Sequence, residues 1–280
     1  MNQWCRGRIL GVCIAVLIAA GVAPAATAQS MPAASRSDWS DIEGRIQYAY
    51  YTDDARALNG VLNSLKPKPV EGEAESTGDD LITRSYFRAL AHYRLAQVFS
   101  VGKKSQARDA IDDCGEEVDH AVEALPKVPL GLDETPAASH QRAEAYALAT
   151  ACTLAGREMS SLPFGGGRIG SRIDEALKLE PKNPRVRLVE ALVAFERAGK
   201  DAPAKTAAVQ KLRAVTTMFE AARTRASTTP EWGAAEAYAF LGRALFDQRD
   251  VVGAREALER ALLIAPDYGF ARRLMAQITR

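Results

Sequence analysis

The chain has 280 residues, of which 47% are hydrophobic, 25% charged and 7% aromatic, and its formal net charge is +1. This apolar content is enough for a packed core and excludes a disordered chain, while the nearly neutral charge excludes binding to nucleic acid or an anionic membrane through overall charge. Alanine is abundant and β-branched runs are absent, which favours closely packed helices over sheets.

Residues 1–28 have the organisation of a secretory signal peptide. Arg6 and Arg8 precede an apolar stretch from Ile9 to Val22, and Ala26-Thr27-Ala28 offers small residues where a signal peptidase cleaves. We therefore expect cleavage after Ala28 and a mature chain, of charge about −1, that is periplasmic or secreted. An uncleaved membrane anchor is the alternative. No later stretch approaches the roughly 18 apolar residues of a spanning helix, so we expect no transmembrane segment after cleavage.

A disordered leader is expected over residues 29–37, and helices are expected from there to the C-terminus. Ser40-Asp41-Ile42-Glu43 has the form of a capping box, so a helix should follow it through Tyr50. A second helix should start at Thr52-Asp53-Asp54. The later helices are expected over about Leu81–Val101, Ala107–Leu125, Pro136–Met159, Ile169–Glu180, Pro184–Phe195 and Ala202–Thr224.

The stretch from Ala235 to Pro266 has the clearest pattern. Apolar and small residues recur on one face of each of two helices at three- and four-residue spacing, separated by a polar turn. Small residues at the contact let two antiparallel helices approach closely, and Pro266 ends the second helix because it donates no backbone hydrogen bond. The residues of the two faces are Tyr238, Leu241, Gly242, Leu245, Ala254, Leu258 and Ala261.

These residues resemble the tetratricopeptide repeat, in which an aromatic residue precedes Leu-Gly and a large residue, followed by Ala-x3-large and a proline. Leu245 stands where an aromatic residue is commoner in that family, and Leu258 replaces a phenylalanine. The resemblance implies an all-α fold, an irregular α-solenoid of about five antiparallel helix pairs over residues 38–280. Its best-matching repeat is 235–266, and a C-terminal capping helix is expected over 267–279.

Two cysteines, Cys114 and Cys152, remain after the expected cleavage. In an oxidising compartment they are candidates for a disulfide. The alternative is two small buried hydrophobic residues, and the sequence alone does not decide between them because it does not give their separation.

No catalytic constellation is recognisable, so we expect neither enzyme activity nor a cofactor. The three histidines, His92, His120 and His140, do not combine with the cysteines in the spacing of a closed zinc site, so no metal is expected. A glycine-rich segment at 165–171 lacks the Lys-Ser/Thr pair of a phosphate-binding loop. The acidic residues between Asp109 and Asp119 are either a solvated helix face or a docking patch for a basic partner.

In the family that this chain resembles, the first helix of each pair lines a groove that binds a peptide or a partner's helix. The corresponding residues here are His92, Ala96, Phe99, Glu236, Ala239, Arg243 and Phe246. Arg243 is suited to a carboxylate or a backbone carbonyl, and the two phenylalanines to apolar pockets or, alternatively, to the core between repeats.

The function that this resemblance implies is a protein–protein interaction scaffold of the bacterial cell envelope, which binds an envelope protein in its groove. The alternative is a ligand-binding or accessory component of an envelope transport system, and a third possibility is self-association. A closed apolar pocket near Tyr146, Phe164 and Phe195 would favour the transport component over the scaffold.

Overall fold

The computed structural model describes residues 39–66, 78–126, 135–159, 167–223 and 232–279. The expected signal peptide (1–28) and leader (29–37) lie outside these residues, as does Phe164.

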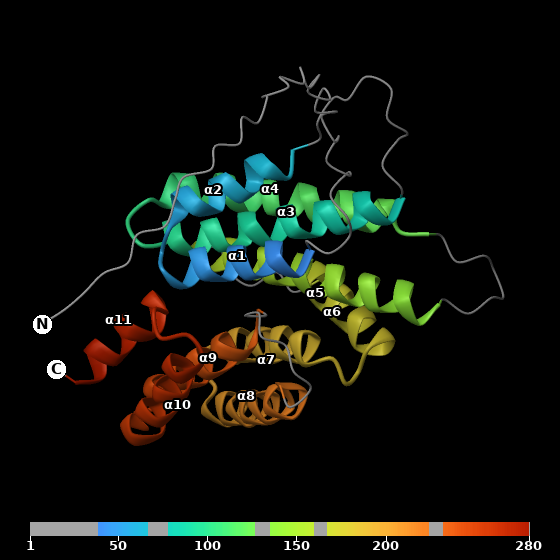
Figure 1. Ribbon diagram of the computed structural model, residues 1–280. Helices are drawn as coiled ribbons and strands as arrows, with labels where there is room; N and C mark the ends of the chain where they lie inside the picture. Colours follow the sequence, from blue (N-terminus) through green and yellow to red (C-terminus); the bar gives the residue numbers. More distant parts are fainter. Residues whose placement is uncertain (1–38, 67–77, 127–134, 160–166, 224–231, 280) are drawn as a thin grey trace, which may run out of the picture. The chain divides into compact units, whose positions relative to one another are not determined.

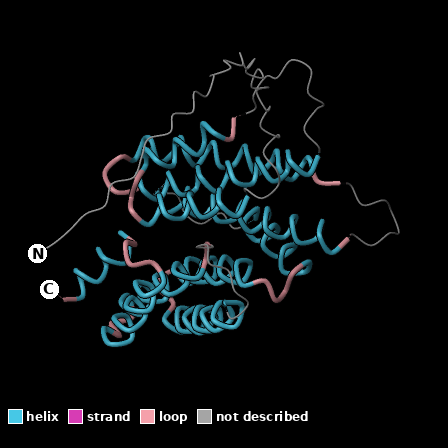
Figure 2. The backbone as a smooth tube through the Cα atoms, viewed as in Figure 1, coloured by secondary structure: helices cyan, strands magenta, loops and turns pink. Residues whose placement is uncertain are grey.

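Eleven helices account for nearly all of the described residues, and none of those residues is in a strand (Figures 1 and 2). None of the described helices is long and apolar enough to cross a membrane. The all-α prediction is therefore confirmed. The helices are α1 (Trp39–Tyr51), α2 (Ala55–Ser64), α3 (Gly78–Phe99), α4 (Lys104–Ala124), α5 (Pro136–Met159), α6 (Gly167–Leu179), α7 (Pro184–Ala198), α8 (Ala202–Arg223), α9 (Ala234–Asp247), α10 (Val251–Ile264) and α11 (Gly269–Ile278).

Consecutive helices form five pairs, α1/α2 to α9/α10, and α11 follows as a single helix. Each helix packs against the next one in the chain, and the first helix of each pair also packs against the first helix of the following pair. Turns of three or four residues join the helices within four of the pairs, which makes those helices antiparallel. This packing confirms the expected solenoid of about five pairs with a capping helix.

The contact between α9 and α10 depends on Gly242. A Cβ atom at this position would lie 2.8 Å from Cγ of Leu258 and 3.1 Å from the carbonyl oxygen of Ala254. Leu258 is fully buried there, and Tyr238, Leu241 and Leu245 are buried on the facing helix. A residue without a side chain at 242 therefore lets these two helices approach closely.

A side chain caps the backbone at the start of α7. Asn183 accepts hydrogen bonds from the backbone N–H groups of Arg185 and Val186, at 2.8 and 3.3 Å, and Pro184 is the first helical residue. The start of α1 differs, because the helix begins at Trp39 and Ser40 is already inside it. The Trp39 ring stacks on Phe87 with centroids 5.6 Å apart.

The two ends of the helical array are joined by hydrogen bonds and an ion pair. The Tyr50 hydroxyl is 2.7 Å from the Tyr268 hydroxyl, and Gln47 donates to the Glu236 carboxylate at 2.7 Å. Asp53, in the turn after α1, pairs with Arg273 of α11. A simple solenoid has contacts only between neighbouring repeats, so α1 adds a connection that the repeat pattern does not predict.

Candidate functional site

A cleft of about 210 Å³ lies on the side of the array formed by the first helices of the pairs, which we call the inner side. Helices α1, α3, α5, α7, α9 and α11 all contribute side chains to it, and α4 and α8 contribute one residue each. The first helices thus converge on one site, although their residues are spread over most of the chain.

Apolar side chains form most of the cleft lining. Helix α5 supplies Ala151, Leu154 and Ala155, and the small alanines leave space for an occupant. The rings of Phe240 on α9 and Phe270 on α11 also line the cleft, with their centroids 5.8 Å apart. Such a lining receives an apolar group and removes it from water.

The polar residues of the cleft carry equal numbers of positive and negative charges. Asp53 and Arg273 form an ion pair, and Glu196 and Arg243 supply one further charge of each sign. A balanced set of charges favours no charged ligand over a neutral one. Uncharged hydrogen-bonding groups are also present, on Gln97 and Ser100.

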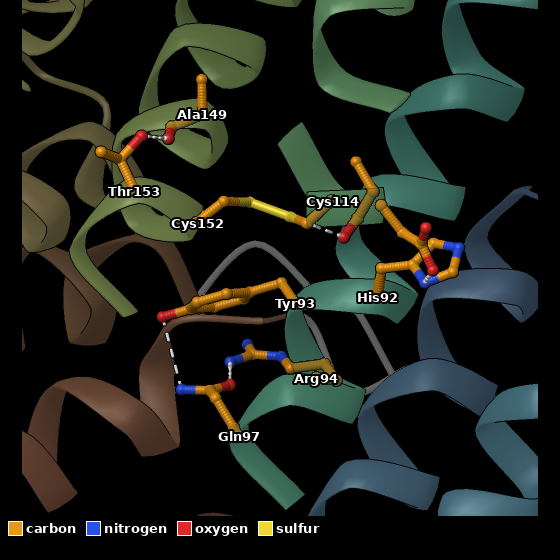
Figure 3. The surroundings of a disulfide bond; sticks show 10 residues. His92, Tyr93, Arg94, Gln97, Cys114, Ala149, Cys152 and Thr153 are labelled. Atoms are coloured by element: carbon orange, nitrogen blue, oxygen red, sulfur yellow. Dashed lines mark hydrogen bonds and ion pairs between the residues drawn. A yellow bond between two sulfur atoms is a disulfide. The ribbon is translucent and has the colours of Figure 1, made fainter. Parts of the chain in front are cut away.

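A buried polar network lies behind the cleft. Arg94 on α3 donates hydrogen bonds to Glu236 on α9, to Gln47 on α1 at 3.0 Å and to Gln97 at 2.7 Å. The Glu236 carboxylate also accepts from the Tyr51 hydroxyl at 3.0 Å and from the backbone N–H of Gly233. Gln97 also lines the cleft. Its hydrogen bond with Arg94 therefore connects the network to the cleft wall (Figure 3).

Burial and charge shift the ionisation of this network. Burial raises the pKa of Tyr50 to about 12, partly offset by the nearby Arg94 guanidinium. Burial also raises the pKa of Tyr268 well above its ordinary value. Burial is the largest single effect on the pKa of Arg94 and lowers it, but the Glu236 carboxylate and the neighbouring tyrosines together outweigh burial, and the net pKa is raised. The two tyrosines are therefore neutral and Arg94 is charged at physiological pH.

A second polar cluster joins α1, α5 and α7. Arg185 donates to Glu43 at 2.7 Å and to Glu144 at 3.4 Å, and Asn183 donates to Glu144 at 2.6 Å. Glu43 also accepts from the backbone N–H of Trp232 at 2.9 Å. Since these carboxylates are paired within the protein, the cluster fixes the positions of the helices rather than offering a free ligand.

Cys114 and Cys152 lie together on α4 and α5, next to the cleft (Figure 3). Their Cα atoms are 6.2 Å apart, within the range of a disulfide, and their sulfur atoms are at bonding distance. Both residues are buried. In the part of the chain that the structure describes, no group of three His, Cys, Asp or Glu side chains is arranged to hold a metal ion.

The predicted groove residues occupy different environments. Arg243 and Ala96 line the cleft. Glu236, which we expected to face the groove, is only 1% exposed. Gln47 and Tyr51 of α1 and Arg94 of α3 donate internal hydrogen bonds to the Glu236 carboxylate, and Glu236 does not line the cleft.

The other predicted groove residues do not line the cleft. Phe99 and Phe246 are partly buried and pack against the hydrophobic core, which corresponds to the alternative given for them above. His92 points toward α4, with Nδ1 3.4 Å from Asp113 Oδ2. Burial lowers the pKa of His92, although Asp113 acts in the opposite direction.

Sequence reasoning missed several aromatic residues of the cleft. Phe240 precedes Arg243 by one helical turn and faces the same way, so helical spacing from Arg243 is a signal that would have found it. Phe270 belongs to the capping helix and had no such signal. Of the residues that were expected to mark a closed pocket, Phe195 lines the cleft and Tyr146 packs against the core instead.

Comparison with known proteins identifies no family. No family model and no curated protein matches the chain. Among solved structures, the chain is similar to YrrB, a TPR protein described as having an unusual peptide-binding site. The TM-score is 0.35 and the identity 16%, over 79% of this chain and 91% of that one. At these values the likeness assigns neither a family nor a ligand. The packing of this chain's own helices is what makes it an all-α, tetratricopeptide-like array.

Proposed function

We propose that this protein is a peptide-binding helical-repeat scaffold, and that the cleft receives a large apolar side chain of a partner protein. The observation that carries this proposal is that the first helices of all five pairs and the final helix α11 contribute to one mainly apolar cleft. The cleft charges balance, which suits a neutral side chain. Gln97 and Ser100 also line the cleft. Each makes a hydrogen bond within the protein, and the second amide hydrogen of Gln97 and the lone pairs of the Ser100 hydroxyl would serve the peptide groups beside the bound side chain.

The size of the cleft supports a side chain rather than a larger ligand. Pockets that enclose drug-sized molecules measure about 300–1,000 Å³, and this cleft measures about 210 Å³. An occupant of this size is one apolar anchor residue, and such anchors contribute most of the affinity of many protein interfaces.

We further propose that the scaffold works in the bacterial cell envelope. The support is the signal-peptide pattern of residues 1–28, with cleavage after Ala28. An oxidising compartment would also suit the close approach of Cys114 and Cys152. The partner is then another envelope protein.

A ligand-binding role in envelope transport is the second candidate. The support is that Gln47 and Tyr51 of α1 hydrogen-bond to Glu236 of α9, so α1 lies close to the start of α9 beside the cleft. This arrangement suits a small apolar molecule as well as a side chain.

Site-specific photo-cross-linking in intact cells tests the proposal. A benzophenone amino acid placed at Ser100, an exposed residue of the cleft, is expected to capture one envelope protein reproducibly. The matched control places the same amino acid at Val252, which is 71% exposed on α10 and not part of the cleft. The substitution Ala155→Phe, which fills the cleft, is expected to abolish capture at Ser100.

Three other outcomes would count against the proposal. Equal capture at Ser100 and Val252 would mean that the cleft has no special role. Capture of only a second copy of this chain would indicate self-association. Capture of no protein, together with a small molecule that co-purifies with the wild type and is lost in Ala155→Phe, would favour the transport role.

A further inference from the structure

The paired cysteines Cys114 and Cys152 lie beside residues that line the cleft. Cys114 belongs to α4 and Cys152 to α5, and Sγ of Cys114 is also 3.2 Å from the carbonyl oxygen of Ala89 on α3 (Figure 3). Three helices thus meet at this one point, and two of them would be joined there covalently.

Residues within one helical turn of each cysteine line the cleft. Ile111 precedes Cys114 by three positions on α4, and Ala151 and Ala155 flank Cys152 on α5. The two helices are also close at Gly156, where a Cβ atom would lie 3.2 Å from Cγ2 of Ile111. The separation of α4 and α5 at the cysteines therefore determines where one cleft wall lies.

Loss of the bond would release this wall. A disulfide links the two helices covalently at one point, whereas two thiols form no such link. Cys114 and Cys152 are both buried between α4 and α5, so without the bond only non-covalent packing would hold the two helices together there.

We propose that a Cys114–Cys152 disulfide braces the α4–α5 wall, so that the cleft binds its peptide only in the oxidised protein. This inference rests on the proposed function. It makes binding dependent on the compartment: the chain would be inactive in a reducing cytoplasm and would acquire its binding site after export.

The bond forms by exchange with a disulfide-bearing thiol oxidoreductase. The thiolate of one cysteine attacks the oxidoreductase disulfide and releases one of its thiols, and the second cysteine then displaces the other. Both cysteines of this chain are oxidised by two electrons in total, and the oxidoreductase disulfide is reduced to two thiols. Both sulfur atoms are buried in the folded protein, so the exchange takes place during folding, before α4 and α5 pack together.

The test compares oxidised and bond-free protein with one neutral probe, N-acetyl-phenylalanine amide, which carries an apolar side chain between two peptide groups. The full chain is exported through its own N-terminal segment and purified without reductant, and mass spectrometry after alkylation counts its free thiols. Saturation-transfer NMR then measures probe binding. We expect no free thiol at residues 114 and 152, and about tenfold weaker binding or more in Cys114→Ala/Cys152→Ala.

Two controls separate bracing from a general loss of stability. Wild-type protein that is unfolded, refolded and kept in reductant has an unchanged sequence, and it is expected to bind as weakly as the double variant while circular dichroism shows it to be helical. Leu58→Ala removes a fully buried side chain from α2, which does not line the cleft. This variant keeps the bond and is expected to bind the probe like the wild type.

The outcomes distinguish this inference from the function on which it rests. Free thiols in the exported protein, equal binding by oxidised and bond-free protein, or equal weakening in Leu58→Ala would each overturn the brace while leaving the cleft as a binding site. Failure of the oxidised wild type to bind the probe would overturn both.

Discussion

The Arg94 guanidinium and the Glu236 carboxylate form an ion pair in which both side chains are 1% exposed. The two residues lie on α3 and α9 and are 142 positions apart in the sequence. Gln47 of α1 hydrogen-bonds to both of them. This one contact therefore joins the first, second and fifth helix pairs.

Removal of one partner should destabilise the protein strongly. In Glu236→Ala the charged Arg94 stays buried without its carboxylate, and we expect a loss of about 3–5 kcal/mol in the free energy of unfolding. The double substitution Arg94→Met/Glu236→Leu should cost less than Glu236→Ala, because no unpaired charge is left. Urea denaturation measures both. A double variant that is less stable than the single one would contradict this account.

The tyrosine pair at the ends of the array should behave as a coupled unit. Tyr50→Phe leaves the Tyr268 hydroxyl buried without its partner at 2.7 Å, and Tyr268→Phe does the reverse. Each single change should cost about 1–3 kcal/mol. The double change should cost less than the sum of the two, which a double-mutant cycle in urea detects. Additive losses would show that the two hydroxyls do not depend on each other.

Gly242 and Gly115 give a matched pair of glycine substitutions within helices. Gly242→Ala would place Cβ 2.8 Å from Leu258 Cγ, so we expect destabilisation by about 1–3 kcal/mol from overpacking. Gly115 on α4 has no atom within 4 Å of the added Cβ. Gly115→Ala should therefore stabilise the protein by about 0.5–1 kcal/mol through helix propensity. Thermal unfolding of both variants checks the two signs, and equal shifts would contradict the packing argument.

His92 should make stability depend on pH in a mildly acidic range. Burial is the largest influence on the pKa of His92 in the folded protein and lowers it. Arg88 also lowers this pKa, whereas Asp113 and Glu117 raise it. The unfolded chain titrates near the ordinary value of about 6.5. It therefore binds more protons than the folded protein just below that pH, and the free energy of unfolding falls as pH decreases from about 6.5 toward the folded pKa.

The variant His92→Gln is expected to remove this component. Urea denaturation at several pH values between about 7 and 5 should give a smaller loss of stability for the variant than for the wild type. Identical pH dependence in the two proteins would mean that His92 does not titrate differently on folding.

Local sequence patterns determined the helices and their pairing. Three- and four-residue periodicity, the Asn183-Pro184 cap and the proline stops depend only on residues a few positions apart, so they can be read directly from the chain. Pro136–Met159 was predicted with the bounds that α5 has. The same periodicity puts Arg243 on the face of its helix opposite Tyr238 and Leu245, and Arg243 lines the cleft.

Only the tertiary structure decided what the inner side contains. Glu236 and Arg243 lie on the same helix, yet Glu236 is buried by α1 and Arg243 lines the cleft. That difference arises from hydrogen bonds between α1 and α9, whose residues are nearly 200 positions apart, such as Gln47 and Glu236 at a separation of 189. Periodicity carries no information on such contacts, because it reports the face of a helix and not which distant helix covers that face.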